Sequence, residues 1–205
     1  SGEADPGPQL PGVLPLQLLI VGAGAIGNGI VHLLRLLPVS GQCWVVDQQV
    51  FKPENLGTCL LIGPEDLEAS KAIFAAERLN HRLEARGFHE DFARFEARLG
   101  AEIPYPKVVV TGLDNIDARH EVQRIWPDLI IDGAISDFGC QASRHLWGED
   151  TACLLCLFRH PTGEPAERLQ SRATGLSLTR VLRALELVSE DDVAIAPKEK
   201  QDWLR

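Results

Sequence analysis

Short apolar runs alternate with longer amphipathic stretches through the first two thirds of the chain. The apolar runs predict strands at residues 17–21, 43–47, 107–111 and 129–132. The amphipathic stretches predict helices at residues 25–37, 66–84 and 116–125. Between them, Phe88, Phe92 and Phe95 recur at about helical spacing and are expected in the core. This alternation predicts an α/β fold: a doubly wound, mostly parallel sheet with helices on both faces.

A glycine-rich turn follows the first predicted strand, in the sequence LLIVGAGAIGNG at residues 18–29. Gly22 permits the tight turn, Gly24 lets backbone N–H groups approach a phosphate, and Gly27 lets the next helix pack against the strand. The helix N-terminus then offers unpaired donors to an anion. This pattern predicts a nucleotide site on a Rossmann-like fold, and the alternative is a glycine-rich turn of some other α/β protein.

Polar residues stand at or just after the predicted strands. Asp47 ends the second apolar run, about 20 residues past the glycines, where a ribose hydroxyl would need an acceptor. Thr111, Asp114 and Asp132 hold similar positions on later strands. Because the carboxyl ends of parallel strands share one edge, we expect these four residues to converge. Asp132 is left outside the predicted site.

Composition narrows the class of protein. The 205 residues and 45% apolar content suit one domain with an appendage. The formal net charge of -9 argues against a nucleic-acid or membrane-surface partner. No apolar run reaches the about 20 residues that span a bilayer, and the N-terminal residues lack the basic start of a secretory signal. We therefore expect a cytoplasmic protein.

The two ends of the chain differ from the middle. Residues 1–15 are rich in proline and predict a disordered leader. The domain is expected at 16–158, followed by a polar crossover or linker segment at 159–205 with a helical pattern at 177–187. The segment has no closing strand, so the fold is expected to be incomplete at its C-terminus.

The five cysteines suit a reducing compartment, because only Cys153 and Cys156 are spaced as a pair. Cys43, Cys59 and Cys140 stand among apolar neighbours and are expected to be buried.

Further polar residues follow in a fixed order. Asn55 lies in VVDQQVFKPENLG, Lys71 in EASKA, Asp114 in TGLDN, and the cysteine pair in CLLC. Taken singly, Lys71 could be a solvated helix residue, Asn55 a turn residue and Asp114 a helix cap. In this order, residues 16–158 resemble the ThiF/MoeB-like activating enzymes, the superfamily that includes the ubiquitin-activating enzymes.

The resemblance implies ATP-dependent adenylation of the C-terminal carboxylate of a ubiquitin-like or sulfur-carrier protein, which gives an acyl-adenylate and pyrophosphate. It assigns these roles: Gly22 and Gly24 approach the phosphates, Asp47 holds the ribose, Asn55 and Lys71 contact phosphates, and Asp114 anchors Mg²⁺. Asp114 and Lys71 are thereby the catalytic candidates. A lysine offers a point charge to phosphate, and a carboxylate suits a hard cation.

The resemblance also implies a homodimer and a downstream conjugating enzyme. The stretches NLGTCLLIG and ATGLS resemble bacterial members linked to ubiquitin-like conjugation in antiphage systems. A thioester-forming cysteine, where the family has one, lies beyond the cysteine pair. Cys153 and Cys156 resemble half of the family's structural Zn²⁺ site, which His160 or another subunit would have to complete. The alternative is that the pair is a metal-free remnant of that site.

The chain departs from the family pattern at three positions. Thr58 stands where an arginine is typical, and Gln49 and Thr111 stand where aspartates are frequent. Either another arginine, such as Arg35 or Arg119, replaces the missing phosphate cation, or the geometry of the site differs.

These departures keep two alternatives open. One is a non-catalytic scaffold that binds a ubiquitin-like protein, which ATP-dependent pyrophosphate exchange would distinguish. The other is an NAD-dependent oxidoreductase that uses the same glycine turn and Asp47, which NAD binding would distinguish.

Overall fold

The strands form one mostly parallel sheet. The computed structural model describes residues 12–136, 139–146 and 152–159. Within them the strand order is β3-β2-β1-β4-β5-β6, where β1 to β5 are parallel and β6 returns antiparallel to β5. The strands are β1 Leu14–Val21, β2 Val39–Val46, β3 Glu84–Phe88, β4 Val108–Thr111, β5 Leu129–Ser136 and β6 Gly139–Leu146. This confirms the predicted doubly wound, Rossmann-like α/β fold.

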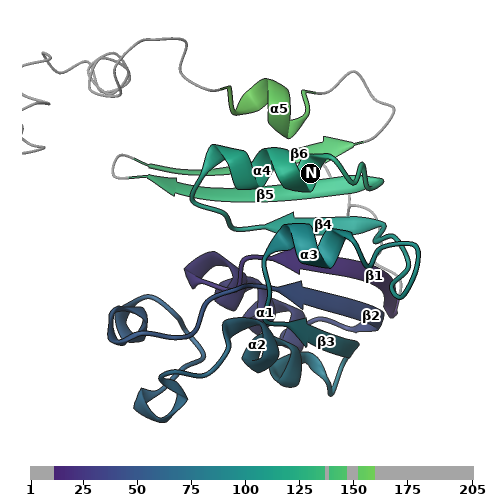
Figure 1. Cartoon of the computed structure of the whole chain (residues 1–205). Helices are drawn as coiled ribbons and strands as arrows, with labels where there is room; N and C mark the ends of the chain where they lie inside the picture. Colours follow the sequence, from purple (N-terminus) through teal and green to yellow (C-terminus); the bar gives the residue numbers. More distant parts are fainter. Residues whose placement is uncertain (1–11, 137–138, 147–151, 160–205) are drawn as a thin grey trace, which may run out of the picture. The chain divides into compact units, whose positions relative to one another are not determined.

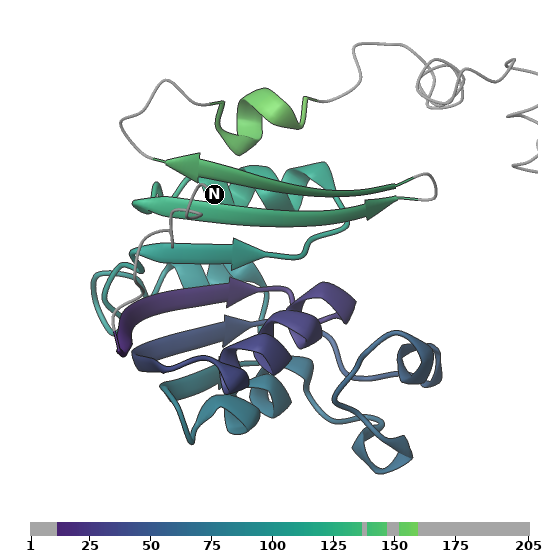
Figure 2. The same ribbon diagram turned by 180° about the vertical axis from the view of Figure 1, so that it is seen from behind.

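Helices cover both faces of the sheet, with α3 and α4 on one side (Figure 1) and α1 and α2 on the other (Figure 2). The helices are α1 Ala25–Leu36, α2 Lys71–Leu79, α3 Phe92–Glu96, α4 Ile116–Gln123 and α5 Leu154–Leu157. Successive strand residues point to opposite faces, so Leu18 packs with α1 and α2 while Leu19 packs with α3 and α4. Two buried cores result, one on each face.

The helix predicted at 66–84 is wrong at both ends. Two short 3₁₀ turns, Pro53–Gly57 and Pro64–Asp66, occupy the loop before it. The helix α2 begins only at Lys71, because the Ser70 hydroxyl accepts a hydrogen bond from the Ile73 N–H and caps it. It ends at Leu79, and the chain enters β3 at Glu84. The Asn80 side chain accepts from the Ala85 N–H and fixes this exit.

The three phenylalanines belong to two elements rather than one helix. Phe88 ends β3, while Phe92 and Phe95 lie on α3, and all three rings belong to the same hydrophobic cluster. Their core position is as predicted.

The strand β6 and the length of β5 escaped prediction. Gly139, Cys140, Gln141 and Ala142 are all exposed, so no apolar periodicity marks this strand. Cys140 is therefore not buried as expected, whereas Cys43 and Cys59 are. Because β5 continues to Ser136, Asp132 lies within the strand and not at its end.

The ends of the chain are only partly described. The strand β1 begins at Leu14, inside the predicted leader. Residues 1–11 and the helix expected at 177–187 lie outside the described residues. The compact units are Ser1–Phe158 and Arg159–Arg205. None of the helices in the described ranges is long and apolar enough to cross a bilayer.

Candidate active site

A cavity of about 510 Å³ opens where β1, β2 and β4 end. Gly22, Gly24, Asp47, Lys71 and Asp114 all line it. Ligands of parallel α/β sheets bind at these carboxyl ends, where the strand order reverses around β1. The structure thus brings together five of the residues that the sequence singled out.

Another hollow, of about 710 Å³, lies at the opposite ends of β2 and β3, against Gln42, Trp44 and Arg86. None of the predicted site residues lines it. We therefore take the cavity at the carboxyl ends as the candidate active site.

The glycine turn has the geometry that its sequence predicted. Gly22 adopts a φ of +87°, in the left-handed region that favours glycine. A Cβ on Gly27 would lie 2.1 Å from the carbonyl oxygen of Gly22, so only glycine lets α1 start this close to the turn. A Cβ on Gly24 would meet nothing within 4 Å. Gly24 precedes α1 and faces the cavity, which leaves the helix N-terminus open to an anion.

The Asp47 side chain is hydrogen-bonded to this glycine turn. One carboxylate oxygen accepts from the Ala23 N–H at 2.8 Å, and the other accepts from the Gln49 N–H at 2.7 Å. Each oxygen retains acceptor capacity for a further donor. The side chain therefore fixes the glycine turn to the end of β2 and still presents acceptors to the cavity that it lines.

Lys71 is the first residue of α2 and is only 5% exposed, so the solvated alternative is wrong. Its Nζ donates to the side-chain oxygen of Gln49 at 2.8 Å. Within the described part of the chain, Lys71 is the one lysine or arginine that lines the cavity.

Asp114 lies in the turn between β4 and α4, and its carboxylate accepts from the Asn115 side chain at 3.1 Å. Asn115, and not Asp114, caps α4, because its side-chain oxygen accepts from the Ala118 N–H at 2.8 Å. Asp114 is exposed and lines the cavity. Its carboxylate is thereby available for a ligand in this position.

Asn55 does not line the cavity. Its side-chain oxygen accepts from the Lys52 N–H at 2.9 Å, and its carbonyl accepts from the backbone N–H groups of Thr58 and Cys59. In this conformation Asn55 organises its own turn, which is the alternative that the sequence had left open.

Three further carboxylates line the cavity and were missed: Glu90, Asp91 and Glu121. Glu90 pairs with Arg98 at 2.9 Å, and Asp91 caps α3 by accepting from the Arg94 N–H. Glu90 and Asp91 follow the carboxyl end of β3 just as Asp47 follows β2. A strand assigned at 84–88 would have revealed them. Among the described residues, the lining therefore carries more carboxylates than the single cation of Lys71.

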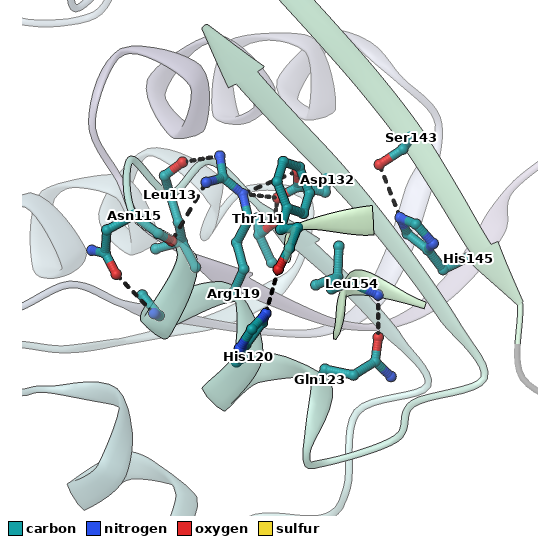
Figure 3. Close-up of polar contacts among 12 residues, drawn as sticks. Thr111, Leu113, Asn115, Arg119, His120, Gln123, Asp132, Ser143, His145 and Leu154 are labelled. Carbon is teal, nitrogen blue, oxygen red and sulfur yellow. Dashed lines mark hydrogen bonds and ion pairs between the residues drawn. The ribbon is translucent and has the colours of Figure 1, made fainter. Parts of the chain in front are cut away.

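Neither arginine proposed to replace the family's phosphate contact lines the cavity. Arg35 lies in the last turn of α1, at the far end of that helix from the glycine turn. Arg119 is buried, and its guanidinium donates to Asp132 and to backbone carbonyls (Figure 3). Neither arginine replaces the missing cation in this conformation, which leaves the alternative of a different geometry.

Cys153 immediately precedes α5 and Cys156 lies within it, with sulfur atoms 3.6 Å apart, and neither lines the cavity. Partial burial raises the pKa of the Cys153 thiol, but hydrogen bonds from the N–H and thiol of Cys156 and from the Leu155 N–H outweigh it and hold the pKa below its ordinary value. The described residues contain no group of three or more His, Cys, Asp or Glu side chains that could hold a metal. His160 lies outside them, so the Zn²⁺ expectation gains no support.

Comparisons with known proteins place this site in context. The chain is 32% identical over 161 residues to protein y4jF of Sinorhizobium fredii, covering 78% of this chain and 30% of that protein. It is 27% identical over 117 residues to the NEDD8-activating enzyme E1 catalytic subunit of Dictyostelium discoideum, covering 56% of this chain and 26% of the relative. The chain thus spans about a quarter to a third of these relatives.

Among solved structures, Escherichia coli MccB has the same fold, with a TM-score of 0.54 and 15% identity over 78% of this chain and 48% of MccB. The model of the ThiF family matches residues 13–189. Because this match covers most of the sequence and includes every residue that lines the cavity, the chain belongs to the ThiF family.

Proposed function

We propose that this chain is an adenylation domain that uses ATP and Mg²⁺ to activate the C-terminal carboxylate of a ubiquitin-like or sulfur-carrier protein. One observation carries the proposal: Gly24, Asp47, Lys71 and Asp114, from four separate segments, line a single cavity. Membership of the ThiF family and the relatives named as NEDD8-activating subunits support the reaction class.

The residues of the cavity match the parts of a nucleotide. Asp47 accepts a ribose hydroxyl, and the N-terminus of α1 beyond Gly24 faces the phosphates. The ammonium of Lys71 offsets phosphate charge, and the carboxylate of Asp114 holds the cation. Bound Mg²⁺ would neutralise charge on the triphosphate.

The reaction needs positioning more than acid–base chemistry. A carboxylate oxygen of the carrier forms a bond to the α-phosphorus, and the bond from that phosphorus to the oxygen bridging to the β-phosphate breaks. Pyrophosphate leaves with the electron pair, and no proton has to move. Lys71 and the helix N-terminus lower the barrier by holding the triphosphate and offsetting its charge.

The proposal also covers the protein's location and its partners. We place the protein in the cytoplasm as a homodimer that passes the activated carrier to a conjugating enzyme. Support for a dimer comes from the sheet face on the α1 side, where Ile131 and Ile135 of β5 are 39% and 69% exposed. Sedimentation of the purified protein tests this, and a monomer at all concentrations contradicts it.

Calorimetric titration with ATP and MgCl₂, beside NAD at the same concentration, tests the proposed function. Saturable ATP binding is expected, and Asp114→Ala should abolish its dependence on Mg²⁺. The matched control is Asp128→Ala, which removes an exposed carboxylate that does not line the cavity. Binding of NAD without binding of ATP would contradict the proposal and favour an NAD-dependent oxidoreductase.

Catalysis is then measured by ATP–pyrophosphate exchange with candidate carrier proteins. Exchange that depends on both carrier and Asp114 supports adenylation. Binding of ATP without exchange for any carrier that binds the protein favours a scaffold.

A further inference from the structure

The turn that carries Asp114 is held by one buried side chain. The guanidinium of Arg119, on α4, donates to the carbonyl oxygen of Leu113 and, at 3.4 Å, to that of Asn115 (Figure 3). These carbonyls belong to the residues on either side of Asp114. One planar group therefore restrains the backbone both before and after the residue whose carboxylate lines the cavity.

The guanidinium is itself fixed from two more directions. Its Nε lies 3.3 Å from each carboxylate oxygen of Asp132 on β5, and Asp132 has no exposed surface. The Thr111 hydroxyl at the end of β4 also donates to Asp132. The centre of the Phe158 ring lies 4.3 Å from the central carbon of the guanidinium. Arg119 consequently has little rotational freedom.

The buried pair of Arg119 and Asp132 contributes little to the free energy of unfolding by itself. Burial of an ion pair costs desolvation free energy that its attraction barely offsets, and apolar side chains of similar volume often serve as well. The hydrogen bonds to Leu113 and Asn115 are what an apolar replacement could not supply. They act on the turn and not on the packing of α4.

We propose that Arg119 is a positioning residue that presets the direction of the Asp114 carboxylate toward the metal-bound nucleotide. The inference rests on the proposed function. A side chain direction depends on the backbone dihedrals of its own residue, and hydrogen bonds to both flanking carbonyls restrict those dihedrals. A preset carboxylate loses less conformational entropy when it binds a cation.

The test separates positioning from stability. Arg119→Lys keeps the charge beside Asp132 but cannot reach both carbonyls with a planar fork. Arg119→Met with Asp132→Asn removes both charges and keeps an acceptor for Thr111. The matched control is Arg124→Met, because Arg124 lies at the C-terminal end of α4 and forms an exposed pair with Glu96. Thermal melting confirms that each variant is folded.

The quantity measured is the ratio of the ATP dissociation constants without and with MgCl₂, by calorimetry. The Arg119 variants should reduce this ratio about tenfold and change Mg²⁺-free ATP binding less than about twofold. Introducing the Arg119 changes into Asp114→Ala should cause no further loss, since Arg119 acts on this ratio only through Asp114. Arg124→Met should leave the ratio unchanged.

Hydrogen–deuterium exchange provides a readout without nucleotide. In Arg119→Lys, amides at 112–118 should exchange faster while those of β1 and β2 keep their protection. An unchanged Mg²⁺ ratio in both Arg119 variants, with ATP binding intact, would overturn the inference and leave the proposed function standing. Absence of ATP binding by the unmodified protein would overturn the proposed function, and the inference would fall with it.

Discussion

The ammonium of Lys71 is bound to a neutral partner, the side-chain oxygen of Gln49, at 2.8 Å. The backbone N–H of Lys71 also donates to the backbone carbonyl of Gln49, so the two residues are joined through both their backbones and their side chains. Where the family often has an aspartate, glutamine orients the lysine without neutralising it. Thr58 stands where the family pattern has an arginine, and Gln49 and Thr111 stand where it often has aspartates, so one positive and two negative charges of that pattern are absent.

Lys71→Met should weaken ATP binding at least about tenfold, because a charge-assisted hydrogen bond to phosphate contributes about 1.5–3 kcal/mol. Lys107→Met is the control, since Lys107 is exposed at the opposite end of the sheet, where its N–H bonds to Gln17 before β4 begins. Calorimetric titration of both variants checks this. Equal affinities for the two would remove Lys71 from the site.

Asp47→Ala should affect both stability and ligand choice. The change leaves the Ala23 and Gln49 N–H groups without their acceptor, which costs about 1–3 kcal/mol in the free energy of unfolding. The unmodified protein should bind ATP more tightly than 2′,3′-dideoxy-ATP, and the variant should bind both alike. Urea unfolding and competition binding measure the two effects. A preference for ATP that survives in the variant would place the ribose elsewhere.

Gly27→Ala should destabilise the fold by about 1–3 kcal/mol or more, since the new Cβ would lie 2.1 Å from a backbone oxygen that cannot move freely. Gly29→Ala is a control on the same helix, because its Cβ would meet nothing within 4 Å. That variant should gain about 0.5–1 kcal/mol from helix propensity. Urea unfolding compares them, and losses of similar size would contradict the close approach at Gly27.

The cysteines should differ in alkylation as pH changes. The lowered pKa of Cys153 means that its thiolate forms at a lower pH than an ordinary thiol, so its reaction with iodoacetamide should accelerate at lower pH than that of glutathione. Burial raises the pKa of Cys43 to about 12, so Cys43 should not react while the protein is folded. Mass spectrometry from pH 6 to 9 resolves each site. Rapid labelling of Cys43 in folded protein would contradict its burial.

The sequence predicted the parts of this fold that carry a periodic signal. The first strand, the glycine turn and α1 form one local unit, so their residues alone specify them. The ends of α2 were wrong because Ser70 caps the helix later than Pro64 suggested. The strand β6 was missed because its outward residues are polar or small, and only pairing with β5 defines it.

The sequence predicted the site residues that follow strand ends. It did not predict those whose positions depend on side-chain hydrogen bonds. Asp47 and Asp114 follow from topology, since Asp47 stands directly after β2 and Asp114 lies in the short turn after β4. Asn55 and Arg119 could not be placed this way, because their positions depend on hydrogen bonds to Lys52 and Asp132. Such contacts join groups that no spacing rule relates.

The position of β1 between β2 and β4 has a consequence for synthesis on the ribosome. Gly22, Asp47 and Lys71 all precede the end of β3, so the half of the sheet that holds them emerges first. The second side of β1 stays uncovered until Val108–Thr111 follows. Asp47 and Lys71 leave the ribosome before Asp114, but domains generally fold as units, and the sheet is complete only after β4 has paired with β1. The cavity at the strand ends would therefore form only after Val108–Thr111 has been synthesised, because both β1 and β4 contribute to its wall.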